Sequence, residues 1–372
     1  MDFALIIEEI TSAIVNFTLG NGIMIGVGII LIGLAVFKEY EPVLLLPIGF
    51  GCILANLGMS ADTGFMKVIY DAGIANELFP LLIFVGVGAM IDFSPLLAQP
   101  RMVLLGAAGQ FGIYGTLILA LLLGFPMNEA ASIGAIGAID GPTAIFVSGR
   151  LAPNLLAPIA VAAYSYMSLI PIIQPPIMKL LTTRKERLIR MDYAPRPVSR
   201  LTLVIFPLFV TLIVSLVAPD AAPLIAALML GNLLRESLVV DRLSKSAQNE
   251  IINIATLFLG LAIGATMRAD TFLNLETLAI LALGLFAFIL DTVAGLLFGK
   301  LMAWITGGKV NPLIGASGIS AFPMAGRLSA KMAQDEDFEN FILMHAIGAN
   351  TAGQLGSVIA GGLLLALVTG FI

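Results

Sequence analysis

The chain is poor in the side chains that carry most enzyme chemistry, since its 372 residues include one cysteine, Cys52, and one histidine, His345. Neither a disulfide nor a Cys/His metal cluster can be built within one chain from these two residues. The same shortage argues against a Ser-His-Asp or Cys-His catalytic set. A lone histidine such as His345 is more often structural than a pH switch.

Charged side chains are also scarce, because they make up 12% of the chain while hydrophobic residues make up 59%. Soluble globular domains carry about 25% charged and roughly 45–50% apolar residues, so this composition belongs to a protein embedded in lipid. The net charge of −5 comes without a basic stripe, and we expect no nucleic-acid partner.

Apolar stretches long enough to cross the roughly 30 Å hydrocarbon layer recur along the chain. The longest are residues 21–37, 102–128, 151–178, 201–219 and 346–372. Further candidates are residues 42–60, 78–91, 221–234, 255–267 and 277–299. The period-two alternation of a membrane β-barrel is absent, so the backbone must satisfy its hydrogen bonds in helices. We therefore predict an all-α polytopic membrane protein with about ten helical segments.

The segment 183–200 indicates the orientation in the membrane. It contains six Lys/Arg and two acids, the strongest positive-inside signal in the chain, and we place it in the cytoplasm. When the membrane crossings are counted backward from this segment, residues 130–150 are predicted to enter and leave the membrane on its non-cytoplasmic side. The first residues, 1–17, carry acids but no basic n-region, which argues against a cleaved signal peptide and for a short interfacial helix.

Two stretches of the chain resemble each other. Residues 140–151, DGPTAIFVSGRL, align without a gap with residues 317–328, SGISAFPMAGRL, at an offset of 177 positions. The predicted parts are an interfacial helix and first membrane helix in 1–41, repeat 1 in 42–182, a basic loop and linker helix in 183–220, and repeat 2 in 221–372. Because the linker holds one extra crossing, the repeats are predicted to be inverted, with discontinuous, re-entrant helices as in secondary transporters.

Asp140 is the first candidate for function. It lies in GAIGAIDGPTAI, where Gly134, Gly137, Gly141 and Pro142 prevent a regular helix and free backbone carbonyls as ligands. An ionisable residue at membrane depth is functional by default, although Asp140 could instead lie in a loop at the headgroup level. A hard cation such as Na⁺ prefers the carboxylate, amide, hydroxyl and carbonyl oxygens that such a segment offers.

Repeat 2 supplies more oxygen ligands in two runs of small residues, NPLIGASGISAFPMAGR and HAIGANTAGQ. The polar side chains of these runs are Asn311, Ser317, Ser320, Asn350, Thr351 and Gln354. Any one of them could simply form hydrogen bonds between helices. These polar residues are concentrated in and around residues 317–328, the segment of repeat 2 that aligns with the Asp140 segment, and this concentration favours a binding site.

Three further side chains are candidates. Arg327 ends the second glycine-rich run and could hold a carboxylate bidentately, or serve as a positive-inside anchor. Tyr166 lies in the uncharged span 151–178, where its hydroxyl could pass a proton or merely pack. Asp291, alone in an apolar segment, is a second intramembrane carboxylate and a possible relay.

The segments GAIDGPTAIFVSG, NPLIGASGISAFPMAGR, HAIGANTAGQ and GNLLRE resemble the membrane-embedded beta subunit of biotin-dependent, sodium-translocating decarboxylases. The resemblance covers nearly the whole chain. It implies a subunit that decarboxylates carboxybiotin on the cytoplasmic side, exports Na⁺ and consumes a proton from the far side. The chain lacks an insertion found in some oxaloacetate-type members, which favours the acyl-CoA-type complexes, such as methylmalonyl-CoA or glutaconyl-CoA decarboxylase.

The resemblance also implies roles for individual residues. The implied Na⁺ site consists of Asp140, Asn311, Gly315, Ser320 and Asn350. Asp140 would also exchange the proton, Tyr166 would take part in the proton pathway, and Arg327 would face carboxybiotin.

The implied cofactors are Na⁺ and carboxybiotin, the latter delivered by a partner carrier protein and not bound covalently to this chain. The implied partners are a carboxyltransferase alpha subunit, a biotin carrier subunit and a small membrane-anchoring gamma/delta subunit. We also expect a homo-oligomer in the inner (cytoplasmic) membrane.

The residues by themselves leave an alternative open. Inverted repeats and one buried acid would equally suit an autonomous Na⁺-coupled carboxylate symporter or Na⁺/H⁺ antiporter. A purely structural membrane anchor for soluble subunits explains the intramembrane Asp140 and Arg327 poorly.

Overall fold

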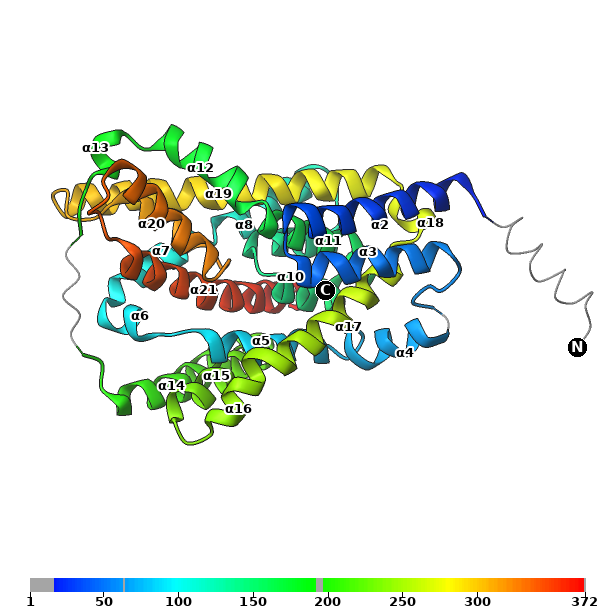
Figure 1. Cartoon of the computed structure of the whole chain (residues 1–372), viewed down its shortest axis with the longest axis horizontal. Helices are drawn as coiled ribbons and strands as arrows, with labels where there is room; N and C mark the ends of the chain where they lie inside the picture. The colour runs from blue at the N-terminus through cyan, green and yellow to red at the C-terminus, as the bar shows by residue number, and fades with distance from the viewer. Residues whose placement is uncertain (1–16, 63, 192–196, 371–372) are drawn as a thin grey trace, which may run out of the picture. The chain divides into compact units, whose positions relative to one another are not determined.

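The computed structural model describes residues 17–62, 64–191 and 197–370, and the regular structure of this part of the chain is helical throughout (Figure 1). The chain divides into two compact units. Unit 1 combines the described residues up to Phe79 with Asn253–Ala279, and unit 2 combines Pro80–Ile252 with the described residues from Ile280 onward. Each unit therefore takes helices from both predicted repeats. Most of the predicted interfacial helix, residues 1–16, lies outside the described residues.

Helix α2 (Leu19–Lys38) precedes repeat 1. The helices of repeat 1 are α3 (Pro42–Asn56), α4 (Gly64–Gly73), α5 (Leu78–Met90), α6 (Ser94–Ala98), η1 (Pro100–Met102), α7 (Val103–Ala108), α8 (Phe111–Leu122), α9 (Met127–Gly134), η2 (Ala135–Ala138), α10 (Gly141–Leu151), η3 (Pro153–Leu155), α11 (Leu156–Ser168) and α12 (Ile170–Leu181). The basic loop and linker contain α13 (Arg184–Arg187), α14 (Arg200–Val217) and η4 (Pro219–Ala221). The helices of repeat 2 are α15 (Ala222–Ser237), α16 (Asp241–Ser246), η5 (Ala247–Ile251), α17 (Ile252–Thr266), α18 (Ala269–Phe272), α19 (Leu275–Ile305), η6 (Pro312–Gly318), α20 (Met324–Glu336) and α21 (Leu343–Thr369).

Within the described residues, each predicted membrane-spanning segment overlaps one or more helices. Within the described ranges, six helical stretches are long and apolar enough to cross a membrane: Leu19–Lys38, Pro100–Leu122, Arg200–Val217, Asp241–Thr266, Leu275–Ile305 and Leu343–Thr369. Two bent pairs, α4 with α5 and α11 with α12, would raise the number to eight. The prediction of an all-α polytopic membrane protein is therefore confirmed.

One predicted crossing differs in shape from the expectation. Residues 151–178 were predicted as a single span, whereas α11 and α12 meet at an angle of 63°. Pro171 lies immediately after the start of α12, and proline removes a helical N–H donor and clashes with the preceding turn. The bend therefore has a local cause in the sequence.

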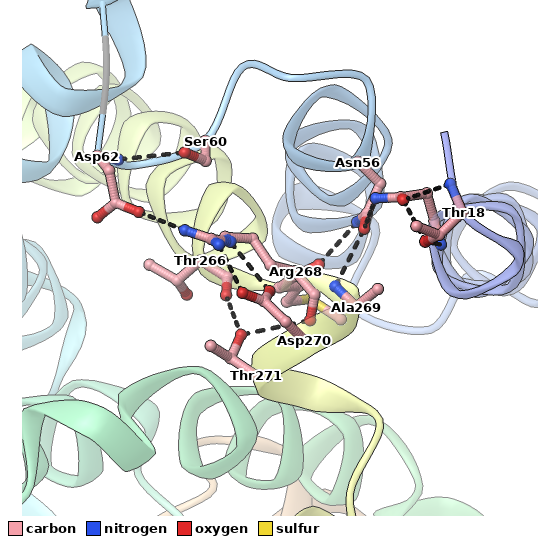
Figure 2. Close-up of polar contacts among 11 residues, drawn as sticks. Thr18, Asn56, Ser60, Asp62, Thr266, Arg268, Ala269, Asp270 and Thr271 are labelled. Carbon is pink, nitrogen blue, oxygen red and sulfur yellow. Dashed lines mark hydrogen bonds and ion pairs between the residues drawn. The ribbon is translucent and has the colours of Figure 1, made fainter. Parts of the chain in front are cut away.

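In unit 1, Asn56 joins the end of α3 to the connection between α17 and α18. Its Nδ2 donates to the carbonyl of Met267 at 2.8 Å, and its Oδ1 accepts the N–H of Ala269 at 3.1 Å. Figure 2 shows this arrangement beside the ion pair of Arg268 with Asp62, whose N–O distance is 2.6 Å. The polar end of this helix pair is thus held by side chains from both repeats.

The same hydrogen bond occurs at matching positions in unit 2. There Nδ2 of Asn232 in α15 donates to the carbonyl of Ile91 at 3.0 Å. The pair Asn232 and Ile91 is related to the pair Asn56 and Met267 by one shift of 176 positions. This shared contact supports the doubled plan that the sequence predicts.

Close glycine crossings accompany these bonds. In unit 2, a Cβ at Gly88 of α5 would collide with the backbone carbonyl of Leu228 in α15. In unit 1, a Cβ at Gly264 of α17 would collide in the same way with Ile48 of α3. Small residues let helix backbones pack closely where lipid supplies no hydrophobic drive for association.

The basic loop is fastened to the end of α20. Arg187 pairs with Glu336 at 2.7 Å, and Arg190 pairs with Asp337 at 2.7 Å. The hydrogen bond from Arg187 lowers the pKa of Glu336. In Figure 1, α13, α20 and the C-terminal end of α19 lie at the same end of unit 2. Residues 183–191 and the end of α20 therefore share one side of this unit.

Candidate functional site

The backbone is not helical at Asp140. The 3₁₀ helix η2 ends at Ala138, Ile139 is left-handed with φ 50°, and Asp140 is extended with φ −140° and ψ 99°. Pro142 then lies in the first turn of α10, where a missing N–H costs no helical hydrogen bond. The break predicted from the glycines and the proline of this segment is therefore present.

Asp140 is buried, with 7% of its surface exposed, and polar side chains bind its carboxylate. Oγ1 of Thr143, one turn along α10, donates to Oδ2 at 2.6 Å. Nε2 of Gln354 on α21 donates to the same oxygen at 3.1 Å. Hydrogen-bonded donors stabilise a buried carboxylate, so the site can hold a negative charge away from water.

Tyr164 covers the first residue of α10. A Cβ at Gly141 would overlap the ring of Tyr164, which is 2% exposed. The glycine after Asp140 is therefore required by close packing, and a tyrosine two residues before the predicted Tyr166 lies against the helix break.

A second break lies in repeat 2. The 3₁₀ helix η6 ends at Gly318, Ile319 is extended, and α20 begins at Met324. Oγ of Ser320 donates to the carbonyl of Gly353 at 3.2 Å. Nδ2 of Asn350 donates to the carbonyl of Ile319 at 2.6 Å. Two predicted ligands, Ser320 and Asn350, thus hold this break against α21.

One stretch of α21 connects the two breaks. Gly353 accepts the hydrogen bond from Ser320, and the next residue, Gln354, donates to Asp140. Asn350 lies one turn earlier on the same helix. The structure therefore brings Asp140, Ser320 and Asn350 together around residues 350–354, as the sequence predicts for one site.

The donor set consists of one carboxylate with hydroxyl, amide and carbonyl oxygens. Among the described residues, no group of three or more His, Cys, Asp or Glu side chains could hold a metal ion. Neutral oxygens with a single negative charge suit a hard monovalent cation. The chemistry of the site fits Na⁺ as a transported ion.

Comparison with known proteins agrees with this chemistry. The family described as the Na⁺-transporting oxaloacetate decarboxylase beta subunit matches residues 20–368. This chain belongs to that family. It is 52% identical to the methylmalonyl-CoA decarboxylase subunit beta of Veillonella parvula, over 99% of each chain. It is also 52% identical to the glutaconyl-CoA decarboxylase subunit beta of Acidaminococcus fermentans, over 96% of each chain. Identity to the oxaloacetate decarboxylase beta chain of Klebsiella pneumoniae is 46%, over 94% of this chain and 95% of that one.

In this member of the decarboxylase beta-subunit family, Arg327 is exposed in the first turn of α20. No ion pair joins it to another side chain in residues 17–62, 64–191 and 197–370. Its repeat twin, Arg150, is stacked over the ring of Phe146 at 4.2 Å. Both arginines are exposed, but Arg150 stacks on an aromatic ring, whereas Arg327 forms no ion pair with the described residues.

Two predicted residues make structural contacts away from Asp140. Asn311 accepts the N–H of Leu313 at 3.0 Å and donates to the carbonyl of Ile189 at 2.8 Å, so it caps η6 and holds the basic loop. The hydroxyl of Tyr166 donates to the carbonyl of Leu281 in α19 at 2.5 Å. Both the nitrogen and the oxygen of the Asn311 amide are therefore engaged in hydrogen bonds that hold the fold.

Gly315 lies where η6 crosses α19, and a Cβ there would collide with the backbone of Gly295. Backbone atoms cannot move aside, so we expect Gly315→Ala to destabilise the beta subunit by about 1–3 kcal/mol. Thermal unfolding of the purified protein in detergent would measure the loss. Gly149→Ala is the control, because no atom lies within 4 Å of its Cβ position. Equal melting temperatures for both variants would contradict the close crossing.

Asp291 is fully buried in α19, and one carboxyl oxygen accepts the N–H of Gly112 in the first turn of α8. A first-turn N–H has no partner in its own helix, so Asp291 acts as a cap from a neighbouring helix. We expect Asp291→Leu to cost about 1–3 kcal/mol of stability, while Asp291→Asn, which keeps an acceptor, unfolds near the wild-type temperature. Loss of Na⁺ transport in a normally stable Asp291→Asn protein would instead indicate the relay.

The structure also places His345 and several residues to which the sequence analysis assigned no function. Nε2 of His345 lies 3.1 Å from Nε2 of Gln99, in keeping with a structural role. Thr143 and Tyr164 received no functional role from the sequence, although Thr143 was visible as the repeat twin of Ser320. Gln110 is one of two amide side chains in the uncharged span 102–128, the other being Asn128 at its end.

Proposed function

We propose that this chain is the membrane subunit of a sodium-pumping decarboxylase that couples decarboxylation of carboxybiotin on the cytoplasmic side to Na⁺ export and proton consumption. The observation that carries the proposal is one buried carboxylate, Asp140, held at the junction of two helix breaks that come from both repeats. Transporters bind ions at such meeting points of discontinuous helices.

Asp140 couples the ion to the proton. Its ionised carboxylate binds Na⁺ together with the oxygens of Ser320 and Asn350, and Thr143 and Gln354 hold the carboxylate in place. A proton that reaches Asp140 removes the charge that retains the ion, so Na⁺ leaves. Consumption of that proton in decarboxylation restores the carboxylate, and transport and chemistry then share one group.

Arg327 binds the carboxylate of the incoming substrate. It lies on α20, whose C-terminal end is ion-paired to the basic loop through Arg187 and Glu336. The positive-inside rule assigns that loop to the cytoplasm, so Arg327 faces the cytoplasm in this proposal. Asp140 and Arg327 then act from opposite sides of two inverted repeats in the inner membrane.

The resemblance gives Tyr166 and Asn311 supporting roles. We assign Tyr166 to the proton pathway, where its hydroxyl would exchange the carbonyl of Leu281 for a water or a carboxylate. Asn311, together with Gly315, contributes to the ion site through the position that it gives to η6.

The lengths over which the relatives align support a preference for one substrate class. Methylmalonyl-CoA and glutaconyl-CoA decarboxylase subunits align with this 372-residue chain over 369 and 362 residues, whereas oxaloacetate decarboxylase chains align over 413 positions. We therefore favour an acyl-CoA substrate. The complex would contain a carboxyltransferase alpha subunit, a biotin carrier, a gamma/delta subunit and more than one copy of this chain.

Transport by the reconstituted complex tests the function. Proteoliposomes that contain the complex should take up labelled Na⁺ when the acyl-CoA substrate is added, and avidin, which sequesters biotin, should stop the uptake. If the isolated chain instead moves Na⁺ in exchange for protons or with a carboxylate, without any biotinylated protein, the chain is an autonomous transporter and the proposal fails.

A further inference from the structure

A third helix break lies beside the two already described. Helix α7 ends at Ala108, α8 begins at Phe111, and Gln110 in the gap is 5% exposed. Its Nε2 lies within hydrogen-bonding distance of three carbonyl oxygens, 3.0 Å from Gly106, 3.3 Å from Gly353 and 3.4 Å from Gly318. One amide of repeat 1 therefore touches both segments of repeat 2 that form the site around Asp140.

Glycines bring these three segments together. A Cβ at Gly106 would collide with the backbone of Ala352 and Gly353 on α21, and a Cβ at Gly109 would collide with the backbone of Gly318. The α7–α8 break, the end of η6 and α21 thus meet at backbone contact. Gln110 starts in this gap, and its Nε2 reaches the carbonyls of both Gly318 and Gly353.

The oxygen of the same amide is unused by the protein. Oε1 of Gln110 is buried and accepts no hydrogen bond from the described residues, and the same holds for Oδ1 of Asn350. The nitrogens of these two amides bind the carbonyls of adjacent residues, Gly318 and Ile319. Because the oxygen and nitrogen of one amide share a carbon, each oxygen lies in the neighbourhood of the carbonyl that its own nitrogen contacts.

An unused amide oxygen is not by itself a ligand. Oδ1 of Asn232 is also buried without a donor among the described residues, but that side chain lies at the crossing of α15 with the end of α5. What distinguishes Gln110 is its contact with the carbonyl of Gly353, which also accepts the hydrogen bond from Ser320. An oxygen in this position meets the ligand preference of Na⁺.

We propose that Gln110 is a further cation-binding residue, whose Nε2 holds the carbonyls of Gly318 and Gly353 while its Oε1 supplies an oxygen ligand to Na⁺. The assignment rests on the proposed function, since it concerns the ion that Asp140 exchanges. It makes repeat 1 the source of two ligands, one charged and one neutral.

The test uses the purified complex in detergent and two measurements. The first is the rise in melting temperature with added NaCl relative to choline chloride, which reports binding without turnover. The second is the Na⁺ concentration that gives half-maximal decarboxylation. For Gln110→Met we expect this concentration to rise roughly tenfold, with a matching weakening of the thermal shift. Unchanged values in both measurements would overturn the assignment.

Gln110→Glu distinguishes the role of the side-chain oxygen as a ligand from the role of Nε2 as a hydrogen-bond donor. It also tests the assignment if Gln110→Met does not assemble. It keeps an oxygen but loses the amide donor, so we expect half-maximal Na⁺ to stay at or below the wild-type value. A rise like that expected for Gln110→Met would mean that Gln110 acts only through its N–H groups, which overturns the ligand assignment.

Two further variants complete the design. Asn232→Leu is the control for loss of a buried amide, and its Na⁺ dependence should match that of the wild type. Asp140→Asn reports on the proposed function itself. If Asp140→Asn removes the Na⁺-dependent thermal shift while Gln110→Met preserves it, the assignment of Gln110 fails and the proposed function stands. If Asp140→Asn preserves the shift, the proposed function fails.

Discussion

Asp140→Asn is expected to abolish Na⁺ uptake by the reconstituted complex, and Na⁺-dependent turnover with it, while the complex still assembles. Asparagine fits the same space and can still accept hydrogen bonds from Thr143 and Gln354, so the junction between α10 and α21 is preserved. The ion loses its charged ligand, which costs roughly 3 kcal/mol or about a hundredfold in affinity. The variant also cannot bind and release the proton.

Uptake of labelled Na⁺ and the Na⁺ dependence of decarboxylation would measure the effect in one preparation. Glu129→Gln is the matched control, because Glu129 lies near the start of α9 in the same segment, away from Asp140, and its carboxylate accepts a hydrogen bond from Asn154 at 3.2 Å. Normal uptake by Asp140→Asn would remove Asp140 from the mechanism, whereas loss of uptake in both variants would point to a general defect of the segment.

The helices and their breaks could be predicted because their causes are local. The uncharged runs mark the helices, and Gly141 with Pro142 marks the start of α10 after the break at Asp140. The angle between α11 and α12 was missed, although Pro171 is its local cause, because apolar length alone does not distinguish a straight span from a bent one.

The composition of the site could be predicted only in part. Asp140, Ser320 and Asn350 do lie around one stretch of α21, and repeat similarity was enough to suggest it. Asp140 and Gln110 also bind groups more than 200 positions away in the chain, namely Gln354 and the carbonyl of Gly318, and no periodicity encodes such a pairing. For Asn311 the sequence predicted an ion ligand, whereas the structure shows that its amide caps η6 and holds the basic loop.

The two polar segments are interrupted helices, whereas α21 is continuous, and this difference matters for ion binding. Both polar segments are interrupted, whereas α21 runs unbroken from Leu343 to Thr369 and carries Asn350, with Gly353 and Gln354 about one turn further along. A continuous helix keeps these groups in fixed spacing while the interrupted segments offer free carbonyls. In the proposed site, the ion would therefore bind between a continuous helix and two backbone breaks.

Arg327→Lys is expected to lower the efficiency of carboxybiotin decarboxylation by about tenfold to a hundredfold, with normal assembly and normal Na⁺-dependent thermal stabilisation. Lysine keeps the charge but cannot form two parallel hydrogen bonds to a carboxylate, and one charge-assisted hydrogen bond is worth roughly 1.5–3 kcal/mol. Arg327→Gln removes the charge as well, so its loss should be larger. Stability should not change, because Arg327 is exposed and forms no ion pair with the described residues.

Decarboxylation of added free carboxybiotin by the solubilised complex would measure this effect apart from the carrier and the carboxyltransferase step. Lys331→Gln is the control, since Lys331 is an exposed cation one turn further along α20 and tests for general attraction of the anion to this helix. An equal loss in Lys331→Gln and Arg327→Gln would mean that α20 attracts the substrate only through its summed charge. A loss confined to Arg327 in kcat/KM, with the Na⁺ requirement unchanged, would place carboxylate recognition at Arg327 and ion exchange at Asp140, so that one site has two unlike sides.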